Sequence, residues 1–239
     1  MKTLLITGAT SGIGKALALH AADNGYQVIA CGRNQDVLDE LASKPNINPL
    51  QFDVTSLEDA KQALRNVKCD IAILNAGTCE YVDIDEFESE MFRRVFEPNF
   101  FGVVNCVEAL IPSLNKGDKL VIVDSMARLL PFTRSQAYGA SKAALHYFTK
   151  SLEVDLHDRG IKVQAVSPGF VETPLTDKND FDMPMKITAT EAAESMLKGI
   201  ETDKQTVFFP RMFGFILRFM HILPVGLQKK LSLSMREKQ

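Results

Sequence analysis

The chain has 239 residues, of which 46% are hydrophobic and 24% charged, and its formal net charge is −3. This composition is typical of a soluble globular protein, and the length suits one α/β domain. The slight acidity argues against a nucleic-acid-binding protein, which needs a basic face. The cysteines (31, 69, 79 and 106) form no CxxC pair or Cys/His cluster, so we expect reduced thiols and no metal site. The N-terminus lacks the regions of a signal peptide, which predicts a cytoplasmic protein.

Short apolar segments alternate along the chain with segments of helical spacing. The predicted strands are residues 3–7, 27–31, 48–52, 70–74, 119–124, 162–166 and 205–209. The predicted helices include residues 15–23, 36–43, 57–66, 100–114 and 136–158. Apolar strands separated by crossover helices predict a Rossmann-type α/β fold, with a doubly wound parallel sheet of about seven strands and helices on both faces.

No linker or repeat interrupts this alternation, so we expect one domain. Residues 1–203 are expected to form its main α/β part, and residues 204–239 to supply the last strand and a helical tail. The segment 170–187 is long for a connection, which is typical of a lid or a binding loop. Its apolar side chains favour an apolar substrate, although a lid packed on its own domain has the same composition. Thr188 and Glu191 form a capping box that begins another helix.

The octapeptide TGATSGIG, Thr7–Gly14, joins the first predicted strand to the first helix. Gly8 suits a tight turn, Gly12 a close backbone approach, and Gly14 close packing of the helix. Such a loop can place backbone N–H groups against a diphosphate at the helix N-terminus, although many glycine-rich loops are only turns.

Three further strand ends carry residues suited to a dinucleotide. Gly32 stands where a carboxylate would hold the ribose of NAD(H), and Arg33 follows it. A guanidinium there favours NADP(H), whose 2′-phosphate it can bind, unless Arg33 simply faces water. Asp53-Val54 can accept the adenine amino group, and Asn75-Ala76-Gly77 lets the backbone approach a ribose. Both also suit ordinary strand-end turns.

Tyr138 and Lys142, in the segment YGASK, lie one helical turn apart on the same face. A Tyr-x-x-x-Lys segment alone is a weak signal. Ser125, however, follows the fifth predicted strand on the same side of the sheet as the glycine loop.

Taken in order, these motifs resemble the short-chain dehydrogenase/reductase family over about residues 1–200. The resemblance rests on Thr7–Gly14, Asp53-Val54, residues 75–77, the NxxG segment Asn99–Gly102, Ser125, Tyr138 with Lys142, and Pro168-Gly169 through Thr173. One departure is Asp124, where the family usually has a small or hydroxyl residue.

The resemblance implies an NADP(H)-dependent oxidoreductase acting on a carbonyl or alcohol. Tyr138 is then the general acid and base, with its pKa lowered by Lys142 and the oxidised nicotinamide ring. Ser125 holds the substrate oxygen, Lys142 also holds the ribose, and Asn99 anchors a relay water. The expected cofactor contacts are Gly8, Thr10, Ser11, Gly12, Ile13, Gly14, Arg33, Asp53, Val54, Asn75, Ala76, Gly77, Tyr138, Lys142, Pro168, Gly169, Val171 and Thr173.

Two other functions fit the same fold: an epimerase or dehydratase, and a sensor or scaffold that binds NADP(H) without turnover. The complete set of Ser, Tyr and Lys favours redox chemistry over both. The family resemblance also implies a homodimer or homotetramer, paired through the helices at about residues 99–115 and 136–159.

The tail differs in charge from the rest of the chain. Residues 204–239 contain seven Lys and Arg against one acid. If residues 211–223 are helical, Arg211, Gly214, Arg218 and His221 share one stripe and apolar side chains fill the rest. Charges and prolines interrupt this segment too often for a membrane span. Two interpretations remain: a helix packed over the cleft or a neighbouring subunit, or a helix on an anionic membrane surface.

Overall fold

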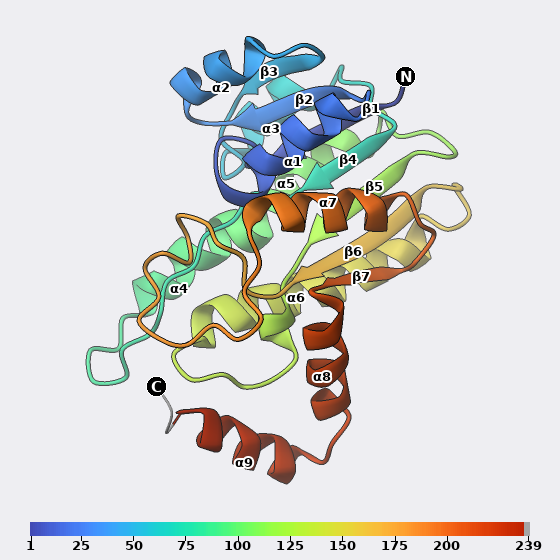
Figure 1. Ribbon diagram of the computed structural model, residues 1–239. Helices are drawn as coiled ribbons and strands as arrows, with labels where there is room; N and C mark the ends of the chain where they lie inside the picture. The colour runs from blue at the N-terminus through green and yellow to red at the C-terminus, as the bar shows by residue number, and fades with distance from the viewer. Residues whose placement is uncertain (237–239) are drawn as a thin grey trace.

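Figure 1 shows the computed structural model, which describes residues 1–236. Its single parallel sheet has the strand order β3-β2-β1-β4-β5-β6-β7, which confirms the predicted doubly wound architecture. The order reverses between β1 and β4, where open α/β sheets bind their ligands. The strands are β1 Thr3–Thr7, β2 Gln27–Gly32, β3 Ile47–Gln51, β4 Ile71–Leu74, β5 Lys119–Val123, β6 Lys162–Pro168 and β7 Thr206–Phe209.

Helices cover both faces of the sheet, so the apolar side chains of the central strands β1, β4 and β5 are buried on both sides. Leu4 and Ile6 of β1 pack with the helices α1 (Gly12–Asp23), α2 (Gln35–Ala42) and α7 (Ala189–Ile200). Leu5, between them, packs with α3 (Leu57–Leu64), α5 (Gly102–Leu110) and α6 (Gln136–Asp155) on the opposite face. Alternate side chains of a strand point to opposite faces, which explains the continuous apolar run.

The helix predicted at 100–114 is instead a π-helical turn, Glu97–Phe101, followed by α5. The helix α4, Ser89–Phe96, precedes it and packs beside α6. The capping box of α7 is confirmed: Glu191 N–H donates to the Thr188 hydroxyl (3.2 Å), and Thr188 N–H donates to the Glu191 carboxylate (2.8 Å).

The tail forms two helices, α8 (Arg211–His221) and α9 (Val225–Arg236), of which only the first was predicted. The stripe of α8 predicted to be polar borders the buried face of the helix: Arg211, Arg218 and His221 are exposed, whereas Phe213, Gly214 and Leu217 are buried. Gly214 is buried against Phe208, the Arg218 guanidinium lies 5.0 Å from the centre of the Phe208 ring, and His221 Nδ1 lies 2.6 Å from the Leu129 carbonyl. Residues 237–239 of the predicted tail lie outside the described residues. Within the described part of the chain, we find no helix with the length and apolar character needed to cross a membrane.

Candidate active site

The glycine loop between β1 and α1 has a conformation that only glycine adopts readily. Gly8 and Gly12 have φ angles of +68° and +51°. A Cβ on Gly8 would lie 2.9 Å from the Ala76 Cα, and one on Gly14 would collide with the Gly8 carbonyl. The backbone therefore passes close to the end of β4 at this point.

The start of α1 leaves its backbone donors free for an anion. Ser11, the N-cap residue, makes no side-chain capping hydrogen bond, and the first turn of α1 contains no acidic residue. Uncapped N–H groups and the helix dipole together favour a phosphate at this position. The predicted contacts Thr10, Ser11 and Ile13 lie in this turn.

Arg33 and Asp53, which follow β2 and β3, are brought together at the same edge of the sheet. The Arg33 side chain is 76% exposed, and its Nη1 lies 3.4 Å from Asp53 Oδ2. A Cβ on Gly32 would come within 2.5 Å of the Thr10 methyl group, so packing explains the missing side chain at this position. Partial burial raises the pKa of Asp53, but hydrogen bonds from Thr55 and the charge of Arg33 outweigh it and lower the pKa overall.

The end of β4 is tied to β1 through Thr7. The Thr7 hydroxyl accepts hydrogen bonds from the N–H groups of Asn75 (3.0 Å) and Ala76 (3.1 Å), and Asn75 Nδ2 donates to the Thr7 carbonyl (3.2 Å). Gly77 follows, and a Cβ there would lie 2.7 Å from Asn99 Oδ1 and 3.4 Å from Lys142 Nζ. The segment 75–77 therefore links the glycine loop to the predicted catalytic residues.

Asn99 is fully buried in the π-helical turn before α5. Its Oδ1 accepts from the Thr78 N–H (2.7 Å), and its Nδ2 donates to the Thr78 carbonyl (2.9 Å) and to Ser141 Oγ (3.0 Å). Gly102 allows the next turn to pack against Val54, since a Cβ would lie 2.8 Å from a Val54 methyl group. The NxxG segment thus joins α4 and α5 to the site, and π-helical turns are common at functional sites.

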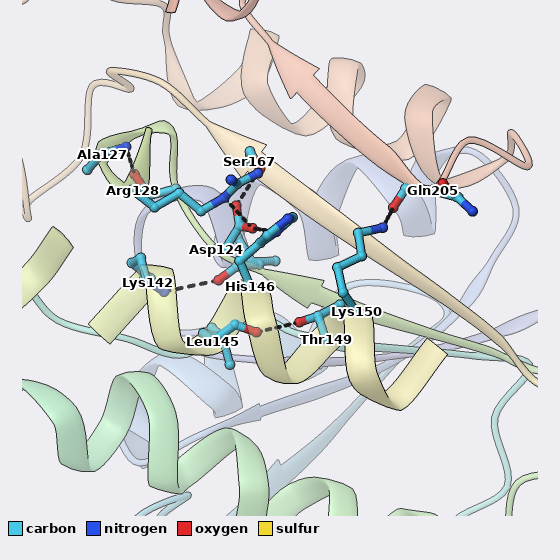
Figure 2. A network of polar contacts seen from close by, with 12 residues as sticks. Asp124, Ala127, Arg128, Lys142, Leu145, His146, Thr149, Lys150, Ser167 and Gln205 are labelled. Carbon is cyan, nitrogen blue, oxygen red and sulfur yellow. Dashed lines mark hydrogen bonds and ion pairs between the residues drawn. The ribbon is translucent and has the colours of Figure 1, made fainter. Parts of the chain in front are cut away.

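Ser125, Tyr138 and Lys142 lie together where β5 ends and α6 begins. The Ser125 hydroxyl lies near enough to Tyr138 to lower the pKa of its phenol. Lys142 is 4% exposed, its Nζ donates to the Val123 carbonyl (3.0 Å), and it lies 5.9 Å from the centre of the Tyr138 ring. Figure 2 shows Lys142 pointing from α6 toward the end of β5.

Burial dominates the environment of Tyr138. It raises the pKa of Tyr138, and the Ser125 hydroxyl lowers that pKa only in part. Burial also lowers the pKa of Lys142 to about 8, despite the nearby Asp124 carboxylate. Burial therefore favours the protonated phenol in the protein alone, and the lowering of its pKa by Lys142 together with the oxidised nicotinamide ring stays a prediction.

Asp124, next to Ser125, is the centre of a buried polar network (Figure 2). Its carboxylate accepts from Arg128 Nε (3.0 Å), lies 2.6 Å from His146 Nδ1, and accepts a hydrogen bond from the Ser167 hydroxyl. The Asp124 side chain is fully buried. This network joins β5, α6 and β6 directly behind Ser125, which accounts for the departure from the family pattern.

The segment after β6 lies over the glycine loop. Val171 is buried and forms an isolated bridge with Ile187, and the Thr173 side chain lies against Gly12, where a Cβ would approach it to 3.2 Å. The ring of Phe170 packs 5.7 Å from that of Phe213 in α8. Pro168 and Gly169 begin this segment, so all the predicted cofactor contacts lie at one edge of the sheet.

Four residues near the site were not assigned to it by the sequence. Arg128 and His146 bind Asp124, and Tyr81 lies 5.4 Å, ring to ring, from Phe181 of the long loop. Cys79, predicted to be a packing thiol, lies near Tyr138, and burial raises its pKa to about 11. Only Cys79 had a sequence signal, its place two residues after Gly77. No group of three or more potential metal-binding side chains is found in residues 1–236.

Comparisons with known proteins agree with this geometry. A family model described as short chain dehydrogenase matches residues 2–183. An uncharacterized oxidoreductase of Myxococcus xanthus is 33% identical over 93% of each chain, and serine 3-dehydrogenase of Rhizobium radiobacter is 30% identical over 83% of this chain and 81% of that protein. The crystal structure of a Burkholderia cenocepacia short chain dehydrogenase in complex with NADP has a TM-score of 0.86 at 25% identity, covering 96% of this chain and 97% of that one.

Proposed function

This chain belongs to the short-chain dehydrogenase family of oxidoreductases, and we propose that it is an NADP(H)-dependent carbonyl reductase or alcohol dehydrogenase. The observation that carries the proposal is the placement of Ser125 and Tyr138 beside the buried amine of Lys142. This group lies at the sheet edge that also carries the glycine loop. A sensor or scaffold would not need an acid, a neighbouring hydroxyl and a nearby cation in this arrangement.

The chain's own residues provide the proton chemistry. NADP(H), when bound, supplies or accepts the hydride. Tyr138, held in its protonated form, donates a proton to the carbonyl oxygen during reduction, while the Ser125 hydroxyl hydrogen-bonds that oxygen. The Lys142 ammonium stabilises the phenolate that results, and we assign it the ribose contact as well. Asn99 is assigned the relay that returns a proton from solvent.

The preference for NADP(H) is supported by Arg33. Its side chain is largely exposed at the end of β2, and Gly32 offers no carboxylate that would repel a 2′-phosphate. The B. cenocepacia structure, determined with NADP, is consistent with this choice. The uncapped N-terminus of α1 suits the diphosphate shared by both cofactors.

The substrate we propose is an apolar carbonyl compound. The loop 170–187 places aromatic rings beside the catalytic end of the sheet: Phe181 packs against Phe170 and Tyr81 at centroid distances of 6.1 and 5.4 Å. Phe170 in turn contacts Phe213. Such a lining binds apolar groups more readily than charged ones. The proposal includes a cytoplasmic location, which four free cysteines suit.

The test is loss of NADPH absorbance across a panel of carbonyl compounds. For an active compound, Tyr138→Phe should lower kcat by roughly 10²- to 10⁴-fold, because the proton donor is lost, and leave NADPH affinity nearly unchanged. Lys142→Ala should lower kcat and also weaken NADPH binding, because we assign Lys142 a contact with the ribose of the cofactor in addition to its effect on Tyr138. Substantial turnover by the Phe variant would assign the proton transfer to another residue. NADPH binding without turnover on the whole panel would favour a sensor.

A further inference from the structure

The outward face of the tail helices is unusually apolar. Exposed large hydrophobic side chains follow α8 and continue into α9: Met212, Phe215, Ile216, Phe219, Ile222, Val225, Leu227 and Leu233. Phe215 and Phe219 are 68% and 57% exposed. We call this set the tail face. On α8 its members are spaced three or four residues apart, so they form one continuous stripe.

The orientation of α8 is held by its other side. Phe213 and Leu217 are buried with Met126 and Leu129 from the segment after Ser125, and Gly214 packs against Phe208. The stripe is therefore not free to turn inward and bury its aromatic rings. Figure 1 shows α8 leaving the sheet at the end of β7, with α9 turning away from its far end.

The charged residues of the tail itself, as far as residue 236, all have one sign. Residues 204–236 contain six Lys and Arg and no Asp or Glu, although the whole chain has a net charge of −3. The ion pairs found among residues 1–236 involve neither Arg211, Arg218, Lys229 nor Lys230. Arg211 and Arg218, seven residues apart, flank the apolar stripe on one side.

An open groove of about 700 Å³ extends this basic edge. It runs between α8 and the domain, and Lys204 and Arg218 line it together with Phe215 and Phe219. Arg128 and His146 also line it, but they contact the buried Asp124 carboxylate. None of the described residues that line it is acidic. Cationic side chains beside exposed aromatic rings match the two layers of an anionic lipid surface, phosphate headgroups above acyl chains.

From these observations we propose that the tail face docks the protein on an anionic phospholipid bilayer. The Phe215 and Phe219 side chains would enter the boundary between headgroups and acyl chains, and Arg218, Lys229 and Lys230 would contact the phosphates. A second copy on this face fits less well, because a two-fold axis would bring the same unpaired cations together. The inference does not depend on the proposed redox reaction.

The test is cosedimentation of the full-length protein with vesicles. Vesicles of equal parts phosphatidylglycerol and phosphatidylcholine should bind the protein at low salt and release it at high salt, whereas phosphatidylcholine alone should bind it at least about tenfold more weakly. Phe215→Glu combined with Phe219→Glu should reduce binding about tenfold or more. The matched control is Ile84→Glu with Phe87→Glu, which changes two exposed apolar residues elsewhere and should leave binding unchanged.

A second pair of variants tests the charge. Lys229→Gln with Lys230→Gln should weaken binding to the anionic vesicles by about tenfold, and Lys44→Gln with Lys68→Gln should not. Circular dichroism checks that each variant is folded, which we expect because the substituted side chains are exposed. Absence of sedimentation with anionic vesicles, or equal binding by the Phe215/Phe219 variant, would overturn the proposal. A change of oligomeric state in that variant without a change in vesicle binding would identify the face as a subunit contact and also overturn it.

Discussion

Arg33 is the residue on which the cofactor preference depends. Its guanidinium is largely exposed, and its Nη1 lies 3.4 Å from Asp53 Oδ2 in a weak surface ion pair. Little energy is therefore needed to redirect it toward a ligand. By contrast, the amine of Lys142 is buried and bonded to a backbone carbonyl. Substitution of Arg33 should therefore change the cofactor preference, whereas substitution of Lys142 should change stability and catalysis.

Arg33→Ala should lower kcat/KM for NADPH and change it little for NADH. A charge-assisted contact to phosphate contributes about 1.5–3 kcal/mol, so the loss for NADPH should be roughly ten- to a hundredfold. Steady-state kinetics with both cofactors measures this. Equal losses for the two cofactors would show that Arg33 does not contact the 2′-phosphate.

Lys142→Met should change how stability depends on pH. The folded protein holds the pKa of Lys142 at about 8, against 10.5 ordinarily, so between these values the unfolded chain binds more protons. The free energy of unfolding of the wild type therefore gains about 3 kcal/mol from this group as the pH rises from 8 to 10.5, and the gain is lost as the pH falls again.

The methionine variant lacks this contribution. The free energy of unfolding of the variant, compared with that of the wild type, should be most favourable at pH 7. Between pH 8 and 10.5 this difference should move against the variant by about 3 kcal/mol. Urea unfolding at several pH values measures it, with the exposed Lys44→Met as the control. Parallel pH profiles for Lys142→Met and the wild type would contradict the assignment.

At the scale of elements, the site depends on contacts that join separate strands and helices. Asp124, just past β5, binds Ser167 of β6, His146 of α6 and Arg128 in the following turn. These groups carry charge or strong dipoles in a largely buried place, where each needs its partner. The network therefore holds the end of β5, and with it Ser125, in one position relative to α6.

Asp124→Ser, which introduces a residue type usual in the family, should destabilise this protein by about 3 kcal/mol, because Arg128 and His146 lose a buried partner. Urea unfolding measures the loss. Glu40→Ala, which breaks the exposed pair of Lys15 and Glu40, is the control and should cost less than about 1 kcal/mol. A loss no greater than the control's would mean that the network does not stabilise the fold.

At the scale of the whole molecule, the described residues leave several groups of apolar side chains exposed. One is the tail face, and another lies on α6 and the π-helical turn before α5, where Tyr147 and Val154 are 79% and 74% exposed and Phe101 is 48% exposed. Side chains of this size on a neighbouring pair of helices are typical of a subunit contact. We therefore propose a homo-oligomer paired through α5 and α6, leaving the tail face available to lipid.

Light scattering at micromolar concentration should give at least twice the mass of one chain. Tyr147→Glu combined with Val154→Glu should shift the protein toward the monomer, because two buried charges would face each other across the axis. The Ile84/Phe87 variant should keep the wild-type mass. A monomeric wild type would refute the proposed pairing.

The sequence alone determined the class of fold and the place of the site. Runs of apolar residues identified seven strands, and the motifs that follow them lie at one edge of the sheet because the carboxyl ends of parallel strands meet there. The boundaries differ by a few residues. Around Asn99 the predicted helix differs more from the observed one, because a π-helical turn precedes α5 there. Hydrophobic periodicity does not predict such a turn, nor the hydrogen bonds of Asn99 to Thr78 and Ser141.

Three other features depend on tertiary packing and could not be predicted from the sequence; the tertiary structure supplied them. It placed Asp124 in contact with His146 and Arg128, raised the pKa of Tyr138 by burial, and turned the Phe213, Gly214 and Leu217 side of α8 toward the domain. Each of these depends on which distant residues surround a side chain and how much water they exclude. Periodicity shows that a helix has two faces, but only packing against β7 and the segment after Ser125 determines which face is buried.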